Sequence, residues 1–256
     1  MSVPRALIRE LERSRARGEK LLLALDFDGT LARLRRRRGD ARLPARRRKS
    51  LAALSAAPGV RLLLVSGRAL SDLRGRARGT GAALAGDHGL RLEGLGAPWR
   101  HPDLARRSRQ AAVLAAAAGK AAHGLSGVSV ERKEASVAVH YRASAAIRRN
   151  SASLRRPLDE ILLPGWRVAP GKCLWELRPS REGSKGEVVR LALKRLGRGW
   201  RAAFIGDDAT DEEGFRSLGR SAWTVRVGPG ATDARWRLRG IGEIDALLTA
   251  VRRARR

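Results

Sequence analysis

The chain has 256 residues and a hydrophobic fraction of 43%, enough for one large domain or two small ones around a buried core. The formal net charge is +29, and the single cysteine excludes an intramolecular disulfide. No apolar run approaches the ~20 residues of a membrane helix, and residues 1–20 lack the apolar centre of a secretory signal, so we expect a cytoplasmic protein with no membrane partner.

The first predicted strand is an apolar run over residues 21–25 that stops at Asp26 and Asp28. Such a run is typical of a buried parallel strand, and ligands bind beyond the carboxyl ends of these strands. Alternation along an extended chain turns both acids to one face, which is costly unless a cation or a shared proton lies between them. Gly29 permits a tight turn, and Thr30 adds a hydroxyl. The pattern indicates a metal-and-nucleophile site.

A strongly basic segment, residues 33–49, follows this strand. One interpretation is a polyanionic partner, either nucleic acid or an anionic membrane surface. Arginine is nevertheless scattered through every segment, and no aromatic residue interleaves with the basic run to stack on bases. We interpret the charge as a solvated, arginine-rich surface that steers an anionic substrate and binds nucleic acid only non-specifically.

Strands and helices then alternate. Residues 1–20 are expected to contain a helix before the first strand, and the following elements are helix 46–57, strand 60–65, helix 69–77 and a short strand at 82–85. The strand at 60–65 ends in Ser66, Gly67 and Arg68. A hydroxyl, a backbone amide and a guanidinium at one strand end suit the binding of an oxyanion.

The pattern changes after residue 98. The next predicted elements are helix 104–118, strands 128–132 and 136–141, helix 144–163, and strands 166–169 and 173–178. This αββαββ order predicts an inserted domain with its own antiparallel sheet. We therefore divide the chain into a first part of the core (1–98), a cap domain (99–178) and a second part of the core (179–256).

Strand–helix alternation returns in the last third of the chain and continues through residues 244–251, which predicts a parallel sheet with helices on both faces. Lys185 stands where a helix begins, near its positive end. A further apolar strand runs into a group of acids, Asp207, Asp208 and Asp211. A second strand end therefore carries clustered carboxylates.

These strand-end groups follow one another in an order that resembles the haloacid-dehalogenase superfamily of phosphatases. The four motifs are Asp26-Phe-Asp-Gly-Thr30, Ser66-Gly-Arg68, Gly183-Ser-Lys185 and Gly206-Asp-Asp-Ala-Thr-Asp211. Further segments narrow the resemblance to the trehalose-6-phosphate phosphatase family, and these are Gly86-Asp-His-Gly89, Val130-Glu-Arg-Lys133, His140-Tyr-Arg142 and Lys172-Cys-Leu-Trp-Glu176.

The resemblance implies an α/β fold, with a Rossmann-like parallel-sheet hydrolase core and an inserted αββαββ cap domain. It also implies a Mg²⁺-dependent phosphatase of trehalose biosynthesis. The expected reaction converts trehalose 6-phosphate to trehalose and phosphate through an aspartyl-phosphate intermediate. The expected partner is a disaccharide phosphate, and we expect the chain to act as a monomer.

The resemblance carries roles over to individual residues. Asp26 is the expected nucleophile, Asp28 the general acid and base, and Lys185 the neutralising charge. The expected metal ligands are Asp26, Asp28 through its backbone carbonyl, and Asp207. Asp208 and Asp211 are expected to act through water or to hold the lysine. The expected phosphate-binding groups are Thr30, Ser66 and Gly67, and the expected substrate-binding residues are Arg68, His88, Glu131, Lys133, Arg142, Lys172 and Glu176.

Two departures from the family pattern are visible: Asp87 stands where asparagine is usual, and Ser184 where aspartate is common. Some assignments also keep simpler alternatives. Asp211 and Glu212 suit an ordinary helix N-terminus, and His140 suits an ordinary sheet position.

Two alternative functions stay open. One is the same chemistry on a sucrose, mannosylglycerate or glucosylglycerol phosphate. The other is a nucleic-acid-binding protein on an inactive phosphatase fold. The intact Asp26, Asp28, Lys185 and Asp207 argue against an inactive fold, because such like-charge clustering is costly without a catalytic use.

Overall fold

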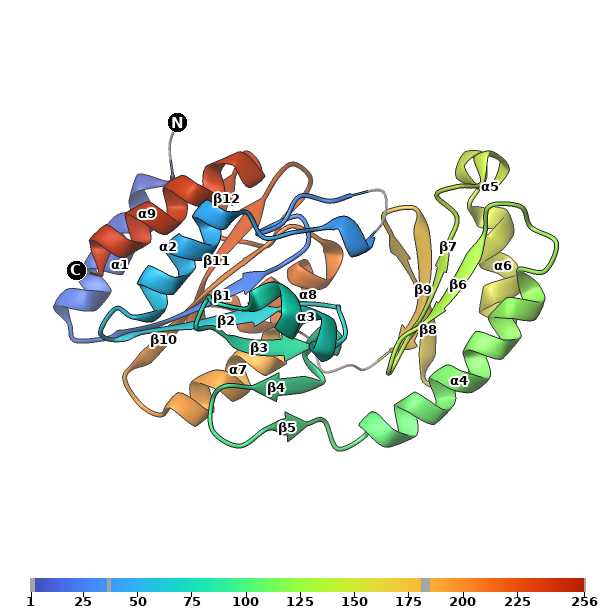
Figure 1. The fold of residues 1–256 in the computed structure, drawn as a ribbon, viewed down its shortest axis with the longest axis horizontal. Coiled ribbons are helices and arrows are strands. Elements are labelled where there is room, and N and C mark those ends of the chain that lie inside the picture. Colours follow the sequence, from blue (N-terminus) through green and yellow to red (C-terminus); the bar gives the residue numbers. More distant parts are fainter. Residues whose placement is uncertain (1–2, 36–37, 181–184, 256) are drawn as a thin grey trace. The chain divides into compact units, whose positions relative to one another are not determined.

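The computed structural model describes residues 3–35, 38–180 and 185–255. They divide into two compact units, shown in Figure 1: a core unit (Met1–Trp99 and Gly183–Arg256) and an inserted unit (Arg100–Glu182). From the sequence we predicted the boundaries of the inserted unit between residues 98 and 99 and between residues 178 and 179. Ser184, one of the two departures from the family pattern, lies outside the described residues. Among the described helices, none has the length and apolar character needed to cross a bilayer.

An eight-stranded sheet forms the centre of the core unit, in the order β12-β11-β10-β1-β2-β3-β4-β5. Its strands are β1 (Lys20–Asp26), β2 (Val60–Val65), β3 (Ala83–Gly86), β4 (Arg91–Glu93), β5 (Trp99–Arg100), β10 (Trp200–Gly206), β11 (Ala222–Val227) and β12 (Trp236–Leu238). From β12 to β3 all neighbours are parallel, while β4 is antiparallel to β3. The predicted α/β parallel-sheet fold is confirmed. The short strands β4 and β5 at one side of the sheet were not predicted.

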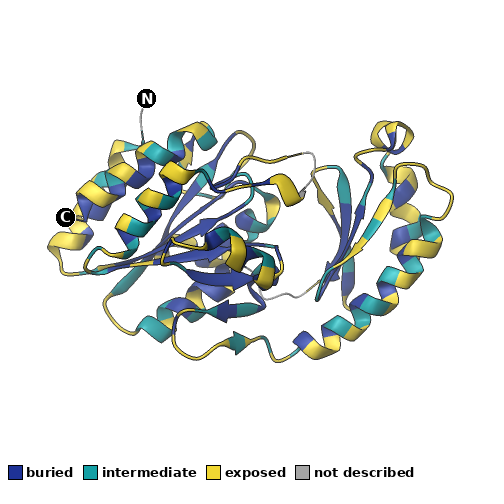
Figure 2. Cartoon of the chain, in the orientation of Figure 1, coloured by how far each residue is buried: buried dark blue, intermediate teal, exposed yellow. Residues whose placement is uncertain are grey.

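Helices cover both faces of this sheet, as the continuous apolar run of β1 predicts. On one face, Leu21, Leu23 and Leu25 pack with helices α1 (Arg5–Ala16), α2 (Ala45–Ser55), α3 (Leu70–Ala77) and α9 (Ile244–Ala254). On the other, Leu22 and Ala24 pack with α7 (Lys185–Leu196) and α8 (Ala209–Leu218). Residues 21–25 of β1 are fully buried, and buried residues fill the middle of this sheet in Figure 2. Asp26 thus ends the middle strand of a sheet closed on both sides.

The inserted unit has a four-stranded antiparallel sheet in the order β6-β7-β9-β8. Its strands are β6 (Ser129–Arg132), β7 (Val137–His140), β8 (Trp166–Gly171) and β9 (Leu174–Pro179), and its helices are α4 (Leu104–Ala121), α5 (Ala145–Arg149) and α6 (Ala152–Glu160). The single helix expected over 144–163 is therefore wrong. The chain leaves helical geometry at Asn150 (φ −140°, ψ 78°), whose carbonyl accepts the hydroxyl of Ser153 at 2.7 Å.

The two faces of the inserted sheet differ in polarity. Pairing between strands aligns Glu131, Ala138, Glu176 and Ala169 in one row across the sheet. The adjacent row contains Val130, Val139 and Trp175, which belong to or pack against the apolar core beneath the unit's helices. Successive rows point to opposite faces, so the charged row lies on the face away from those helices.

Arg47 joins the segment after β1 to the last helix. Its side chain is 4% exposed and pairs with the Asp245 carboxylate at 3.0 and 3.1 Å. It also donates to the carbonyl oxygens of Leu31 at 2.8 Å and Ile241 at 2.6 Å. One buried guanidinium therefore connects three segments that are distant in the sequence.

We expect Arg47→Met to lower the free energy of unfolding by about 1.5–3 kcal/mol, because two buried carbonyls and a carboxylate lose a charged donor. Denaturant unfolding measures this effect. Arg46→Met is the matched control, since Arg46 pairs with the same Asp245 at 2.6 Å from a side chain that is 73% exposed. The control should lose less than about 1 kcal/mol. Equal losses in the two variants would contradict the role of the buried contacts.

Candidate active site

Asp26 is buried at the carboxyl end of β1, with a side chain 3% exposed. Its Oδ1 accepts a hydrogen bond of 2.7 Å from Nζ of Lys185. Its Oδ2 is also buried and has no hydrogen-bond partner among the residues that the structure describes. An unpaired buried carboxylate oxygen is costly. Oδ2 is therefore the atom that this geometry leaves for a ligand.

Lys185, the first residue of α7, is held by acids from another strand end. Besides Asp26, its Nζ lies 2.8 Å from Asp211 Oδ1 and 3.6 Å from Asp208 Oδ1. Asp208 and Asp211 also form a capping box at the start of α8: Asp208 Oδ1 accepts the Asp211 amide at 2.9 Å, and Asp211 Oδ2 accepts the Asp208 amide at 3.0 Å. Asp211 thus both begins a helix and binds the lysine.

Negative charge exceeds positive charge in this cluster. Asp26, Asp207 and Asp211 are buried and bring carboxylate oxygens within 4.8 Å of one another. Burial, opposed by Lys185 and reinforced by the neighbouring acids, raises the pKa of Asp26 well above its usual range. Burial and the charge of Asp208 raise the pKa of Asp211 to about 8. A divalent cation would offset this excess, and three carboxylates are the donor set of a hard cation.

Asp208 and Asp211 were both expected to act through water or to hold the lysine, and both lie near Nζ of Lys185. Asp208 Oδ1 also belongs to the α8 cap, where it accepts the Thr210 amide at 2.8 Å and the Thr210 hydroxyl at 2.7 Å. Asp211 is also the third member of the buried carboxylate cluster.

Gly29 and Thr30 adapt the turn after β1 to Asp207. Gly29 has φ +95°, and a Cβ there would lie 2.2 Å from Asp207 Oδ2, so the position requires glycine. The fully buried Thr30 donates its hydroxyl to Asp207 Oδ1 at 3.2 Å. The turn therefore orients a carboxylate from a different strand.

Asp28 pairs with Arg68. The extended conformation ends at Asp26, and Phe27 lies in a turn, so the strand alternation that we used to place Asp28 beside Asp26 does not reach it. Its carboxylate instead accepts two hydrogen bonds from the guanidinium, 2.6 Å from Nε and 2.7 Å from Nη2. Arg68 Nη1 donates to Asp72 at 2.6 Å.

The loops after β2 and β3 are joined through their backbones. The amide of Asp87 donates to the Arg68 carbonyl at 2.7 Å, and the amide of His88 donates to the Ser66 carbonyl at 3.0 Å. A Cβ on Gly67 would lie 2.3 Å from Cε1 of His88, so only glycine admits the imidazole there. The structure thus brings together the predicted Ser66, Gly67, Arg68 and His88.

Charged residues of the inserted unit form pairs on the polar face of its sheet. Lys133 Nζ lies 2.5 Å from Glu176 Oε1, and His140 Nε2 lies 2.8 Å from Glu131 Oε2. The sequence did not single out Ser136, whose hydroxyl donates to Glu176 Oε1 at 3.0 Å. The tight turn between Lys133 and Ser136 was its only signal, because a strand-initial serine is otherwise unremarkable.

Arg142 and Lys172 lie at the ends of the two hairpins of this unit. The Arg142 guanidinium donates to the carbonyl oxygen of Lys172 at 2.9 Å. The contact therefore links the Arg142 side chain to the backbone of Lys172.

Comparison of the sequence with known proteins identifies a matching family and several relatives. A family model described as trehalose-phosphatase matches residues 24–237. The trehalose-6-phosphate phosphatase of Escherichia coli (strain K12) is 30% identical over 233 residues, which cover 88% of this chain and 84% of that protein. The probable trehalose-phosphate phosphatase of Sinorhizobium fredii (strain NBRC 101917 / NGR234) is 34% identical over 213 residues, covering 81% and 77%. The chain belongs to the trehalose-phosphatase family.

The predicted family and enzyme class are thereby confirmed, and the trehalose-phosphatase is a phosphoric monoester hydrolase. The fold has a solved counterpart in the C-terminal domain of the C. albicans trehalose-6-phosphate phosphatase. The TM-score is 0.83 at 21% identity, and 96% of each chain is covered. Membership in this family implies a divalent metal, in agreement with the buried acidic cluster.

Asp87, the departure from the trehalose-phosphatase pattern that the structure describes, has a structural role. Asp87 (φ 53°) and His88 (φ 57°) both adopt the left-handed region, which aspartate and asparagine tolerate better than most residues. Asp87 Oδ2 accepts the amide of Leu70 at 3.3 Å and so caps the first residue of α3 from outside the helix.

We expect Asp87→Asn to retain phosphatase activity and to change the free energy of unfolding by less than about 0.5 kcal/mol, because an amide oxygen can accept the same bond. Asp87→Ala should lose about 1–2 kcal/mol, since it removes the cap and tolerates the backbone poorly. Thermal unfolding and phosphate release measure both variants. A severe loss of stability in Asp87→Asn would show that the negative charge itself is required.

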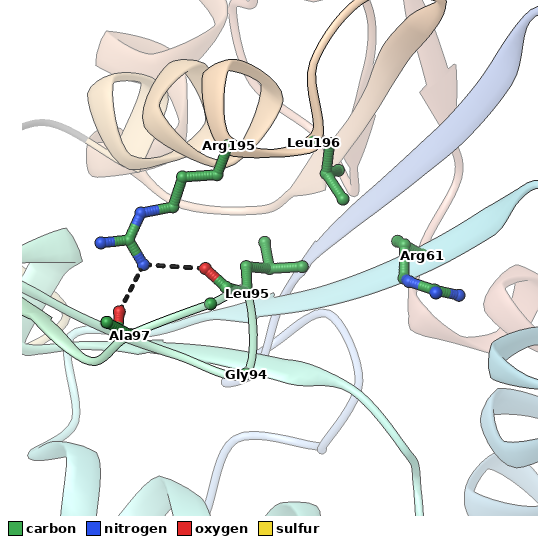
Figure 3. A pocket seen from close by; sticks show the side chains of 7 residues that line it. Arg61, Gly94, Leu95, Ala97, Arg195 and Leu196 are labelled. Carbon is green, nitrogen blue, oxygen red and sulfur yellow. Dashed lines mark hydrogen bonds between the residues drawn. The ribbon is translucent and has the colours of Figure 1, made fainter.

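A separate cavity of about 530 Å³ lies in the core unit of the phosphatase (Figure 3). It is lined by Arg61, Arg195, Leu196 and residues 94–97. Arg195 closes one side by donating to the carbonyl oxygens of Leu95 at 2.8 Å and Ala97 at 2.6 Å. Arg61 lies near the amino end of β2, so this cavity is at the opposite edge of the parallel sheet from Asp26.

Proposed function

We propose that the chain hydrolyses trehalose 6-phosphate to trehalose and phosphate, with Mg²⁺ as its cation and an aspartyl-phosphate formed on Asp26. One observation carries the proposal. Asp26 lies buried at the end of the central strand with one oxygen on Lys185 and the other without a partner among the described residues. We further propose a cytoplasmic monomer that binds nucleic acid only non-specifically.

In the first half-reaction, Asp26 Oδ2 forms a bond to phosphorus while the bond from phosphorus to the sugar oxygen breaks. Asp28 takes up a proton from solvent before this step and donates it to that oxygen, so that trehalose leaves as a neutral alcohol. The Asp28 side chain is 21% exposed, which supports contact with a substrate. Lys185 offsets negative charge on the transferring phosphoryl group, and the Ser66 hydroxyl and Gly67 amide bind its oxygens.

In the second half-reaction, the oxygen of a water molecule attacks the phosphorus of the aspartyl-phosphate. Asp28, now a carboxylate, takes a proton from this water, and the bond between phosphorus and Asp26 Oδ2 breaks. Phosphate leaves, and Asp26 returns to its starting form. Dividing the displacement in this way lowers the barrier of each step.

The Mg²⁺ ion would be held by carboxylate oxygens of Asp26 and Asp207 and by the backbone carbonyl of Asp28, and Asp208 would act through water. When bound, it supplies positive charge against the phosphoryl oxygens. The orientation of Asp207 by Thr30 and Gly29, and of Lys185 by Asp211, supports this donor set.

Phosphate release from a panel of sugar phosphates tests the proposal. The panel contains trehalose 6-phosphate and the phosphates of sucrose, mannosylglycerate and glucosylglycerol. We expect kcat/KM for trehalose 6-phosphate to exceed the others by at least about tenfold, because hydrogen-bonded hydroxyls discriminate strongly between sugars. Faster cleavage of another disaccharide phosphate would keep the reaction class and overturn the substrate.

We propose that the polar face of the inserted sheet binds the sugar part of the substrate and determines which sugar is accepted. The proposed substrate-binding residues are His88 in the core unit and Glu131, Lys133, Arg142, Lys172 and Glu176 in the inserted unit. Arg68, which was also expected to bind substrate, has its three guanidinium nitrogens on Asp28 and Asp72, so we propose that it acts on the substrate through Asp28. Paired carboxylates and ammoniums such as Glu176 and Lys133 suit sugar hydroxyls, because charge-assisted hydrogen bonds are strong.

We expect Glu131→Ala or Lys133→Ala to lower kcat/KM for trehalose 6-phosphate by about 10- to 100-fold, the loss of one charged hydrogen bond. Hydrolysis of p-nitrophenyl phosphate should stay within about twofold of wild type, because this ester has no sugar to bind. Glu160→Ala is the matched control: Glu160 ends helix α6 with a side chain 67% exposed. Equal loss on both substrates would identify a folding defect and contradict the sugar-reading role.

A further inference from the structure

Acidic and basic side chains alternate in a hydrogen-bonded network of the core unit that begins at Asp28. Arg68 holds the Asp28 carboxylate with two hydrogen bonds and donates its third nitrogen, Nη1, to Asp72 at 2.6 Å. Arg76 binds Asp72 from the other side, with Nε at 2.9 and 3.0 Å from its two oxygens. Arg76 in turn donates to the carbonyl oxygens of Ala41 and Gly39 in the segment after β1.

The side chains of this network differ in how far they are exposed to solvent. The Arg68 side chain is 2% exposed, whereas that of Asp72 is 40% exposed. A planar guanidinium that is bound on two sides has little freedom to rotate. The Arg68 side chain also lies over the Phe27 ring, 5.6 Å from its centroid. Asp72 therefore fixes the orientation of a buried group that contacts Asp28, while it remains near solvent itself.

We infer that Asp72 is a positioning residue for the phosphatase reaction, acting through Arg68 on the carboxylate that transfers protons. The inference rests on the proposed function, in which Asp28 protonates the leaving oxygen. Loss of Asp72 frees Arg68 to turn, and Asp28 then loses its fixed direction. A misplacement of about 1 Å in a reacting group can cost about 100-fold in rate.

The leaving group distinguishes this role from a general stabilising one. A sugar alkoxide must be protonated to leave, whereas p-nitrophenolate leaves without a proton. The first irreversible step governs kcat/KM, so kcat/KM for p-nitrophenyl phosphate does not report the general acid. Asp72 also lies in the first turn of α3, where a carboxylate suits the helix dipole. A loss of helix stability alone would act equally on both esters.

The test is Asp72→Asn, assayed on trehalose 6-phosphate and p-nitrophenyl phosphate. Asparagine has one acceptor oxygen and an NH2 donor, so it cannot hold both Arg68 and Arg76 as the two carboxylate oxygens do. We expect kcat/KM for the sugar phosphate to fall about 10- to 100-fold through kcat, with KM nearly unchanged. The value for p-nitrophenyl phosphate should stay within about twofold. Asp72→Glu, which keeps the carboxylate, should recover most of the loss. Asp159→Asn is the matched control, because Asp159 pairs with Arg155 at the same helical spacing, at 3.2 Å, with a side chain 44% exposed.

A double-variant cycle checks that the effect passes through Arg68. In an Arg68→Gln background, Asp72→Asn should add less than about twofold, because the group it positions is already gone. Three results would overturn the inference: equal losses on the two esters, a rise in KM alone, or full additivity in the cycle. A wild-type chain that cleaves neither ester would instead overturn the proposed function and this inference with it.

Discussion

The Asp26→Asn variant is expected to fold normally and to lose phosphate release by more than about 10³-fold. The amide keeps the size of the carboxylate but is a poor nucleophile and carries no charge. The buried cluster has more acidic than basic groups, and burial already disfavours the ionised form of Asp26. Replacing this carboxylate by a neutral amide should therefore not weaken the fold. Steady-state phosphate release and thermal unfolding measure the two outcomes separately.

The Asp159→Asn variant serves again as the control and should match wild type in both measurements. Residual activity within about tenfold of wild type, a barrier change of only ~1.4 kcal/mol, would refute Asp26 as the nucleophile. Loss of folding in Asp26→Asn would refute a different point, the excess of negative charge around Lys185.

Removal of divalent metal is expected to lower activity by about 100-fold or more, and Mg²⁺ should restore it. Ca²⁺ should restore it poorly, because its longer bonds and higher coordination number would shift the nucleophile from the phosphorus. Mg²⁺ should also raise the unfolding temperature, since binding to the folded state alone stabilises it. This thermal shift reports the site without any substrate.

Asp207→Asn is the informative variant here. It should lose the Mg²⁺-dependent thermal shift together with activity, while Asp159→Asn keeps both. Full activity of the wild-type chain in excess chelator would contradict a metal role for Asp207. A thermal shift that persists in Asp207→Asn would show that the ion binds elsewhere.

The sequence predicts the strand-end groups well because each follows a continuous apolar run. Asp26, Ser66 and Asp207 need only the rule that parallel strands share a carboxyl edge. Lys185 joins them because a helix start next to that edge directs its first side chain there. The inserted αββαββ unit is equally visible, since its strands and helices are long enough for their periodicities to differ.

What the sequence does not predict depends on side-chain pairing after the chain turns. Asp28 and Arg68 are 40 positions apart, and no local sequence pattern predicts that they bind each other. The capping box of Asp208 and Asp211 at the start of α8 depends on the orientation of both carboxylates, which no local sequence pattern specifies. Strands β4 and β5 are too short, at three and two residues, for alternation to identify them.

The order of strands in the core sheet has a consequence for synthesis of the protein. β1 is synthesised long before one of its two neighbours, β10, which begins only at Trp200. The four strands of the inserted unit pair only among themselves, so that sheet can form before β10 exists. Until then one edge of the Leu21–Leu25 strand has unpaired backbone N–H and C=O groups, to which other chains can bind. Asp26 accordingly meets Lys185 and Asp211 only after the roughly 185 residues between Asp26 and Asp211 have been synthesised.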